Sequence, residues 1–248
     1  MAANFLSMEQ KAELEATCEH LGQAGKGISA CDESTRTINP RFEKVGVEPT
    51  EERRRAYRQM LFEAPGANEF LTGAILDPET VYQKSTDGRP FPEVLKSLGI
   101  LPGVKPSLTV YKIPGTGGET VMQGLDGLAG RAAEYKAAGC VFAKWRSPLT
   151  IDVAAGTPSE LAIEANCRDL ARYALICQSE GLVPLVEPDV VLKGAHSLEV
   201  AVEVNARVHA SLFKAMAGTC DASVVLLPPF TPELNLSLLS RHVSSTVA

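Results

Sequence analysis

The sequence lacks long apolar runs and an excess of positive charge. No uninterrupted apolar stretch reaches the roughly 18 residues that a transmembrane helix needs, so no membrane-spanning segment is expected. The 248 residues include 24 Lys and Arg against 30 Asp and Glu, which gives a net charge of -6. This balance provides no footprint for nucleic acid or for an anionic membrane. Any anion site must therefore be a local concentration of cations in an acidic protein.

Paired cysteine motifs and a leader-like start are also missing. The six cysteines contain no CxxC pair, and the four histidines form no ligand pair, so we predict reduced core thiols and no metal or other cofactor. Residues Met1–Gln10 do not show the charged-then-apolar pattern of a secretory signal. They also do not resemble a transit peptide. These features predict a cytoplasmic protein, and the sequence leaves a plastid location open.

Short apolar segments alternate with amphipathic helices, which is typical of βαβ units around a parallel sheet. With 45% hydrophobic residues, the chain is long enough for one α/β domain with a sizeable core. The predicted strands are Gly27–Cys31, Leu71–Leu76, Ile100–Lys105, Cys140–Arg146, Leu182–Val186 and Ser223–Leu227. The predicted helices are Met8–Leu21, Glu51–Phe62, Pro92–Leu98, Gln123–Ala138, Pro158–Ser179 and Ser197–Ala217.

Polar residues stand at or just past the ends of five of these six strands. They are Asp32, Asp77, Lys105, Lys144 with Arg146, and Glu187 with Asp189. Ligands of α/β proteins bind outside the carboxyl ends of the parallel strands. Polar ends on so many strands favour a closed barrel, whose loops converge on one mouth, although a full barrel needs eight strands and this chain supplies about six.

The segment Cys140–Arg146 is the one around which the rest is organised. Alternation along a strand places Lys144 and Arg146 on one face and Trp145 on the other. Lysine and arginine are almost never buried unless they are paired, so two of them at the end of a buried strand indicate a site. The alternative is a pair of snorkelling cations over a solvated rim.

Asp32 and Glu187 would supply two carboxylates to a shared mouth, and Lys105, Lys144 and Arg146 would supply three cations. Such a set suits proton transfer on a phosphorylated substrate. Burial and neighbouring charges push carboxyl pKa values apart and lower that of a lysine, which provides an acid, a base and a nucleophile. Arg41 and Arg54 add cations that could reach a phosphate. For Arg54 the alternative is a solvated helix face, and for Asp32 it is a turn or helix-cap aspartate.

Six segments carry a more specific pattern. They are Gly25–Thr35 (GKGISACDEST), Tyr82–Lys84 (YQK), Gly88–Pro92 (GRPFP), Gln123–Leu128 (QGLDGL), Phe142–Arg146 (FAKWR) and Val183–Pro188 (VPLVEP). In this order and at these spacings they resemble the class I fructose-bisphosphate aldolases. The resemblance runs nearly without gaps from about residue 8 to residue 217. The motifs are very specific together, although none is specific alone.

The resemblance implies a (β/α)8 TIM-barrel fold, usually assembled as a homotetramer. It implies reversible cleavage of fructose 1,6-bisphosphate, a sugar phosphate, to dihydroxyacetone phosphate and glyceraldehyde 3-phosphate in glycolysis and gluconeogenesis. The implied chemistry proceeds through a lysine Schiff base and uses no metal. We therefore expect one aldolase-type domain over residues 1–248, incomplete at its C-terminal end, with residues 230–248 as a non-matching tail.

The resemblance also implies roles for individual residues. Asp32 would orient the substrate and assist proton transfer, Glu187 would be the acid/base in imine formation and carbon–carbon cleavage, and Lys144 would stabilise charge beside the imine. The implied substrate-binding residues are Ser34, Thr37 and Lys105 around the distal phosphate, with Arg41, Arg54 and Arg146 in support. Thr37 replaces the serine of the usual pattern and keeps its hydroxyl.

Three positions depart from the family pattern. Pro106–Thr109 replaces an aspartate-lysine-glycine segment, and Asp189 replaces the second glutamate of a Glu-Pro-Glu motif. Pro228 stands where the family has its Schiff-base lysine, and proline has no amine that can form an imine. The alternatives are therefore a catalytically dead aldolase fragment or scaffold, or a chain in which Lys144 or Lys105 is the nucleophile.

Overall fold

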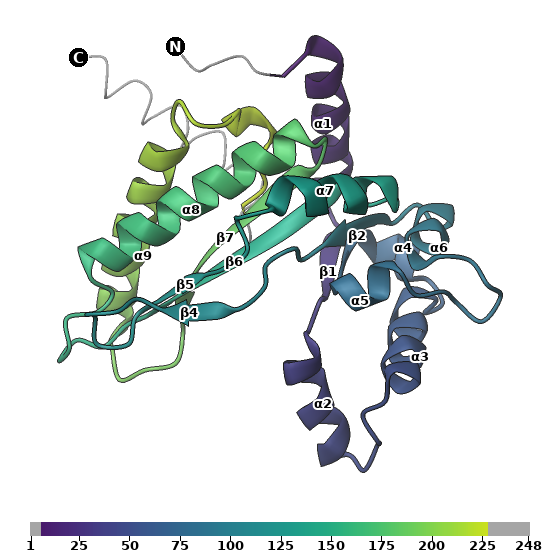
Figure 1. Cartoon of the computed structure of the whole chain (residues 1–248), viewed down its shortest axis with the longest axis horizontal. Helices are drawn as coiled ribbons and strands as arrows, with labels where there is room; N and C mark the ends of the chain where they lie inside the picture. Colours follow the sequence, from purple (N-terminus) through teal and green to yellow (C-terminus); the bar gives the residue numbers. More distant parts are fainter. Residues whose placement is uncertain (1–5, 228–248) are drawn as a thin grey trace.

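A curled sheet of five parallel strands forms the centre of the computed structural model, which describes residues 6–227 (Figure 1). The strands are β1 (Gly27–Cys31), β2 (Leu71–Leu76), β3 (Leu101–Val104), β6 (Phe142–Thr150) and β7 (Val183–Val191). They pair in the order β1-β2-β3-β6-β7. The order follows the chain and every pairing is parallel, which is the arrangement of a (β/α)8 barrel opened part-way around.

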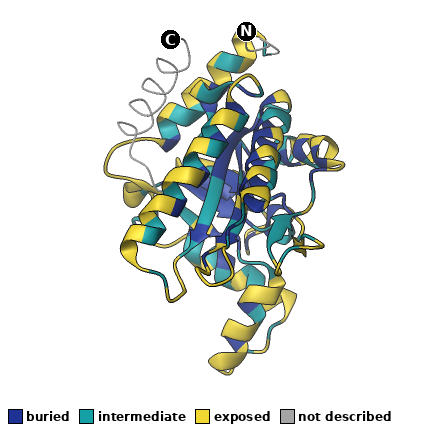
Figure 2. Cartoon of the chain, turned by 90° about the vertical axis from the view of Figure 1, so that its left-hand side faces the viewer, coloured by how far each residue is buried: buried dark blue, intermediate teal, exposed yellow. Residues whose placement is uncertain are grey.

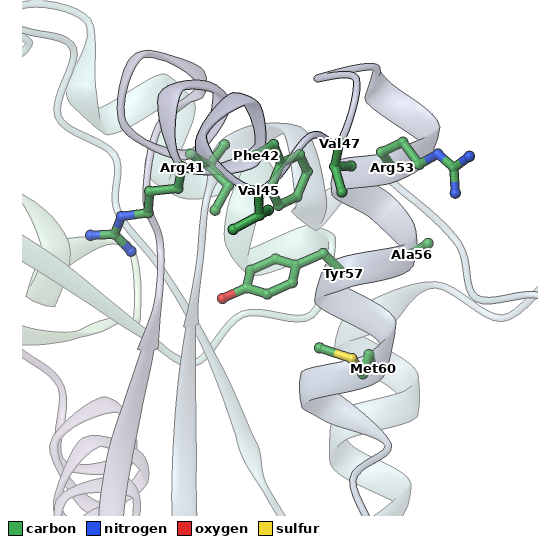
Figure 3. A pocket seen from close by; sticks show the side chains of 9 residues that line it. Arg41, Phe42, Val45, Val47, Arg53, Ala56, Tyr57 and Met60 are labelled. Carbon is green, nitrogen blue, oxygen red and sulfur yellow. The ribbon is translucent and has the colours of Figure 1, made fainter.

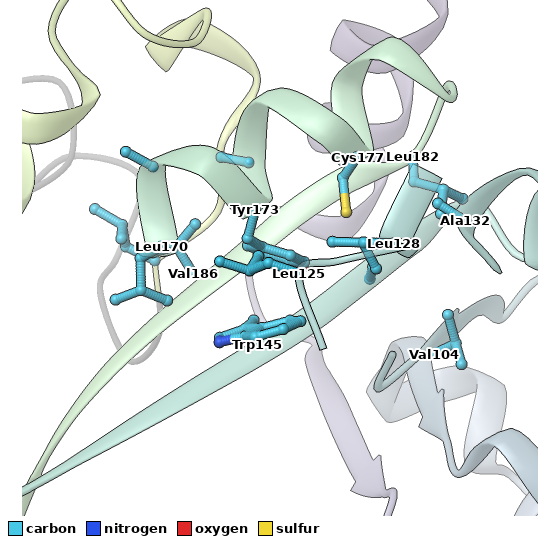
Figure 4. Packing of buried hydrophobic residues seen from close by; sticks show 14 of the residues in the cluster. Val104, Leu125, Leu128, Ala132, Trp145, Leu170, Tyr173, Cys177, Leu182 and Val186 are labelled. Atoms are coloured by element: carbon cyan, nitrogen blue, oxygen red, sulfur yellow. The ribbon is translucent and has the colours of Figure 1, made fainter. Parts of the chain in front are cut away.

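The outer face of the sheet packs against helices α6 (Phe91–Ser97), α7 (Leu128–Ala137), α8 (Glu160–Ser179) and α9 (Leu198–Met216). Ser159 and Ser197 begin α8 and α9, because each side chain accepts a hydrogen bond from a backbone N–H of the first turn. The helices bury their apolar faces on the strands and turn exposed faces outward (Figure 2). Trp145 is fully buried in this layer, with its ring centroid 5.2 Å from that of Tyr173 (Figure 4).

The inner face of the sheet is packed by α1 (Met8–Leu21). Ser7 and Gln10 form a capping box that begins this helix, and its residues Leu14 and Leu21 join the buried cluster around Phe142. The Phe142 ring lies against Gly73 of β2 and Gly103 of β3, where a side chain would occupy the same space. The two glycines therefore let a large aromatic ring fill the inside of the curl.

The remaining elements flank the sheet. Helices α2 (Thr35–Lys44) and α3 (Glu51–Phe62) form an arm that extends below the sheet in Figure 1. Strands β4 (Val110–Lys112) and β5 (Thr120–Met122) form an antiparallel hairpin. The short elements are α4 (Ala67–Phe70), α5 (Pro78–Val81) and the 3₁₀ turn η1 (Ala222–Val224).

The prediction of a sixth strand over Ser223–Leu227 is wrong in most of its length. Asp221 accepts hydrogen bonds from the backbone N–H and the hydroxyl of Ser223, which holds these residues in η1. Only Leu226 reaches the sheet, through one parallel bridge to Leu185. The other five strands are confirmed, with β6 and β7 each extending further than predicted.

One predicted helix begins later than expected. Between the predicted start at Gln123 and the observed start at Leu128 lie two glycines with left-handed φ, Gly124 at 121° and Gly127 at 70°, which are incompatible with a continuous helix. The hairpin β4–β5 and helix α2 were not predicted. Five of the six cysteines are buried, and Cys18 is partly buried.

Glycine at position 103 is expected to be required for the inner packing. In Gly103→Ala the new methyl would lie 2.3 Å from Phe142 Cζ, so overpacking should lower the free energy of unfolding by about 1–3 kcal/mol. Urea unfolding of Gly130→Ala is the matched control, because Gly130 lies in α7 with open space around it. That variant should gain about 0.5–1 kcal/mol. Equal stability of the two variants would contradict this account of the curl.

Candidate active site

The polar residues predicted at the strand ends do meet at one edge of the sheet. Asp32, Asp77 and Lys105 directly follow β1, β2 and β3, while Lys144 and Glu187 lie within β6 and β7. All five strands run in the same direction, so these residues share the carboxyl side of the sheet.

Lys144 is the centre of the cluster. Its Nζ lies 3.2 Å from Glu187 Oε2 and 3.7 Å from Asp32 Oδ2. The side chains of Lys144, Asp32 and Glu187 are 13%, 11% and 24% exposed. A single ammonium therefore lies between two mostly buried carboxylates and offsets part of the repulsion between them.

The curl of the sheet makes the Asp32–Lys144 contact possible. Strands β2 and β3 separate β1 from β6 in the sheet. At the usual spacing of neighbouring strands, β1 and β6 would lie about 14 Å apart in a flat sheet. The 3.7 Å between the two charged atoms therefore spans the mouth of the curl.

Lys105 connects the cluster to the end of β2. Its Nζ donates a hydrogen bond to the Asp32 carbonyl oxygen and lies 3.5 Å from Asp77 Oδ2. Burial raises the pKa of Asp77, and the charges of Lys105 and Arg58 oppose that rise. Asp77 thus shares the site with the residues predicted for it.

Arg146 lies at the rim, where its guanidinium pairs with Asp189. The predicted alternation along the strand is confirmed, because Trp145 is buried on the opposite face while Lys144 and Arg146 point to the site side. Despite its shorter side chain, Asp189 reaches a cation of the neighbouring strand.

The other predicted substrate-binding residues lie on the arm formed by α2 and α3. Ser34 and Thr37 stand at the start of α2, with their hydroxyl oxygens 3.5 Å apart. Arg41 pairs with Glu33 at 2.6 Å, and Arg54 donates two hydrogen bonds to the Glu79 carboxylate. No contact links either arginine to Lys144 within the described residues. Arg54 is mostly buried, so the solvated helix face is the wrong alternative for it.

Arg58 and Glu33, which also lie in this region, were not predicted as site residues. Arg58 is 2% exposed and donates hydrogen bonds to a Glu33 carboxylate oxygen at 2.6 Å and to the Glu33 carbonyl oxygen at 2.8 Å. Burial acts to raise the pKa of Glu33, but Arg58 and Arg41 outweigh it and leave this pKa below its usual range. The available signal was the spacing of Arg54 and Arg58, which places them on one face of α3.

Two surface cavities of the described residues are lined by neither Lys144 nor its two carboxylate partners. One, of about 490 Å³, lies between α2 and α3 and is lined mainly by apolar side chains such as Phe42 and Tyr57 (Figure 3). The Arg41 guanidinium points away from it. The other, of about 700 Å³, lies between α8 and α9.

Residues 6–227 contain neither a membrane-spanning helix nor a metal-ligand group. None of the helices there is both long and apolar enough to cross a membrane. The same residues contain no group of three or more His, Cys, Asp or Glu side chains placed to hold a metal ion.

Arg58, the buried partner of Glu33, should contribute more to the free energy of unfolding than Arg41, the exposed partner. Arg58→Met leaves a largely buried carboxylate without its main partner and should lower the unfolding free energy by about 3 kcal/mol at neutral pH. Arg41→Met removes a side chain that is 59% exposed and should cost less than about 1 kcal/mol. Urea unfolding of both variants measures the difference.

The stability difference between wild type and Arg58→Met should depend on pH. The folded-state pKa of Glu33 is depressed, so the pairing stabilises the fold above the ordinary pKa of a glutamate and is lost as pH falls through the folded-state pKa. The stability gap between wild type and Arg58→Met should therefore narrow as the solution becomes more acidic. A gap that is constant or widens would contradict the ion-pair account.

Comparison with known proteins agrees with this geometry. Residues 13–226 match the family model described as fructose-bisphosphate aldolase class-I, glycolytic. The chain is 52% identical over 205 residues to fructose-bisphosphate aldolase of Dictyostelium discoideum, a match covering 82% of this chain and 57% of that relative. It is 50% identical to the cytosolic fructose-bisphosphate aldolase 6 of Arabidopsis thaliana, with 83% and 57% covered. The chain thus spans about 57% of the length of these curated relatives.

A solved structure shares the fold. Fructose-bisphosphate aldolase from Plasmodium falciparum, in complex with TRAP and a small molecule inhibitor, superposes with a TM-score of 0.89. The match has 41% sequence identity and covers 97% of this chain and 73% of that chain. With its motifs, its curled parallel sheet and these relatives, the chain belongs to the class I fructose-bisphosphate aldolase family.

Proposed function

We propose that this chain serves the class I aldolase reaction, the reversible cleavage of fructose 1,6-bisphosphate to dihydroxyacetone phosphate and glyceraldehyde 3-phosphate. The observation that supports it best is the position of Lys144 Nζ between Glu187 Oε2 at 3.2 Å and Asp32 Oδ2 at 3.7 Å. Cleavage next to a ketone needs groups that give and take protons beside a positive charge, and these three side chains are such groups.

The proposed roles follow the bonds that change. In imine formation a lysine amine adds to the ketone carbon and passes one of its protons to the former carbonyl oxygen. Glu187 supplies the second proton, and the oxygen leaves as water, which forms the iminium. In cleavage Glu187 takes the proton of the hydroxyl next to the breaking carbon–carbon bond, and the bonding electrons move to the iminium. Asp32 orients that hydroxyl and assists the transfer, and Lys144 stabilises the negative charge that develops beside the imine.

The phosphate groups of the substrate are assigned to the surrounding cations. Lys105 would bind the distal phosphate with the hydroxyls of Ser34 and Thr37, while Arg41, Arg54 and Arg146 support the substrate. Arg41 and Arg146 are the more accessible arginines and each pairs with one carboxylate, which a phosphate could replace.

Whether a lysine of this chain can supply the imine nitrogen decides between an active aldolase and a non-catalytic one. Pro228, which occupies the family's Schiff-base position, lies outside the described residues, and it carries no primary amine. Turnover by this chain then requires Lys144 or Lys105 as the nucleophile. The second candidate, favoured by Pro228 itself, is a catalytically dead aldolase fragment or scaffold that binds sugar phosphate.

The remaining assignments rest on the relatives and on the family resemblance. Several relatives are named cytosolic or cytoplasmic, which supports a cytoplasmic location. The family model is described as glycolytic, which supports a role in glycolysis. We also propose a single aldolase-type domain over 1–248, with 230–248 as a non-matching tail, and a homotetramer. Light scattering should then give four times the 26.5 kDa of one chain, and a monomeric mass would contradict the assembly.

Reductive trapping tests the chemistry. Dihydroxyacetone phosphate is added to the purified chain, borohydride reduces any imine to a stable amine, and intact mass reports the adduct. We expect one adduct per chain, mapped by peptide analysis to Lys144 or Lys105. The variants Lys144→Met and Lys105→Met identify which lysine carries it, and Lys112→Met, in the β4–β5 hairpin, is the control.

Three results can follow. Loss of the adduct in one of the two site variants, but not in the control, supports turnover chemistry by that lysine. A folded wild-type chain that binds the triose phosphate without any adduct supports the binding remnant instead. A folded chain that neither binds nor reacts contradicts both functions.

A further inference from the structure

Asp77 is a buried carboxylate of the site to which the proposed reaction gives no task. It follows β2, and the sheet order β1-β2-β3 places it between Asp32 and Lys105. Its side chain is 14% exposed. A carboxylate at this depth needs a partner, because removing its charge from water is costly.

Both oxygens of Asp77 have assigned contacts. Oδ1 accepts a hydrogen bond from the Glu79 backbone N–H at 3.2 Å, which fixes the carboxylate at the start of α5. Oδ2 faces Lys105 Nζ at 3.5 Å. Lys105 also donates to the Asp32 carbonyl oxygen, so oxygens from the ends of two strands hold its ammonium at one place.

The ionised state of Asp77 depends on that ammonium. Burial raises the pKa of Asp77, and Lys105, the Glu79 N–H and Arg58 act against the rise. The other titratable or charged groups that face it are Arg54 from α3 and Tyr135 from α7. Lys105 is the nearest of the cations, so an anion that draws the Lys105 charge toward itself leaves Asp77 buried and less compensated.

We propose that Asp77 is a positioning residue that holds Lys105 for an incoming anion and takes up a proton when the anion binds. The ion pair between Asp77 and Lys105 is replaced by one between the anion and Lys105, and the Asp77 carboxylate becomes a neutral carboxylic acid with a proton from solvent. The inference rests on the proposed function, because it requires Lys105 to bind the phosphate of the substrate. Its consequence is that anion affinity rises as pH falls through the pKa of Asp77 in the complex toward its lower pKa in the free protein.

Titration calorimetry with sulfate tests the proposal. Sulfate does not change protonation between weakly acidic and neutral pH, so any proton taken up belongs to the protein. Titrations in buffers of different ionisation enthalpy give the number of protons per bound ion. Wild type should take up protons when sulfate binds, to a limit of about one proton per bound ion. The number taken up should increase from neutral toward acidic pH.

Substitutions assign the proton. Asp77→Asn keeps an N-cap acceptor and should still bind sulfate with the proton uptake abolished. Asp77→Ser, also a good cap, is the second variant in case the first does not fold. Asp87→Asn is the control, because Asp87 pairs with Arg89 in a turn outside the site and its loss should leave the uptake unchanged.

The outcomes separate this proposal from the function on which it rests. Sulfate binding without proton uptake in wild type, or uptake that persists in Asp77→Asn, overturns the role of Asp77 and leaves the anion site intact. A folded wild-type chain that does not bind sulfate overturns both. Infrared difference spectra of wild type give an independent check, since a protonated carboxyl band should appear when sulfate is added.

Discussion

The curvature of the five-stranded sheet is the constraint on which the site depends. Asp32 and Lys144 come from strands that two other strands separate, and they meet only because the sheet curls. The curl is filled from inside by Phe142, which lies against Gly73 of β2 and Gly103 of β3. One aromatic ring between two glycines therefore supports a charge cluster two residues further along the same strand.

The charges of the site form groups in which opposite signs are paired. Asp77 pairs with Lys105, Lys144 lies between Asp32 and Glu187, and Arg146 pairs with Asp189 at the rim. Lys105 joins the first two groups through a hydrogen bond to the Asp32 carbonyl oxygen. Such pairing lets several ionised groups approach a common space with limited desolvation cost. An anion that enters must displace carboxylates from cations, so binding and proton transfer are expected to be coupled in such a site.

Much of this arrangement could be predicted from the sequence, for physical reasons. Buried parallel strands are short apolar runs, and charged residues at or near their ends are seldom buried without a partner, which identified Asp32, Lys105, Lys144 and Glu187. The β4–β5 hairpin escaped prediction because its strands are only three residues long. Helix α2 escaped because it contains Pro40, a residue that usually ends helices. Arg58 was missed because a buried arginine and an exposed one look alike within a charged helix.

A double-mutant cycle on Asp32 and Lys144 tests most directly whether the curl joins the two ends of the sheet. The free energies of unfolding of Asp32→Asn, Lys144→Met and the double variant are compared with that of wild type. The account predicts a coupling free energy of about 1 kcal/mol or more, since each charge compensates the other in a mostly buried place. Additive effects of the two substitutions would show that the residues act independently, and would contradict a mouth of the curl built around Lys144.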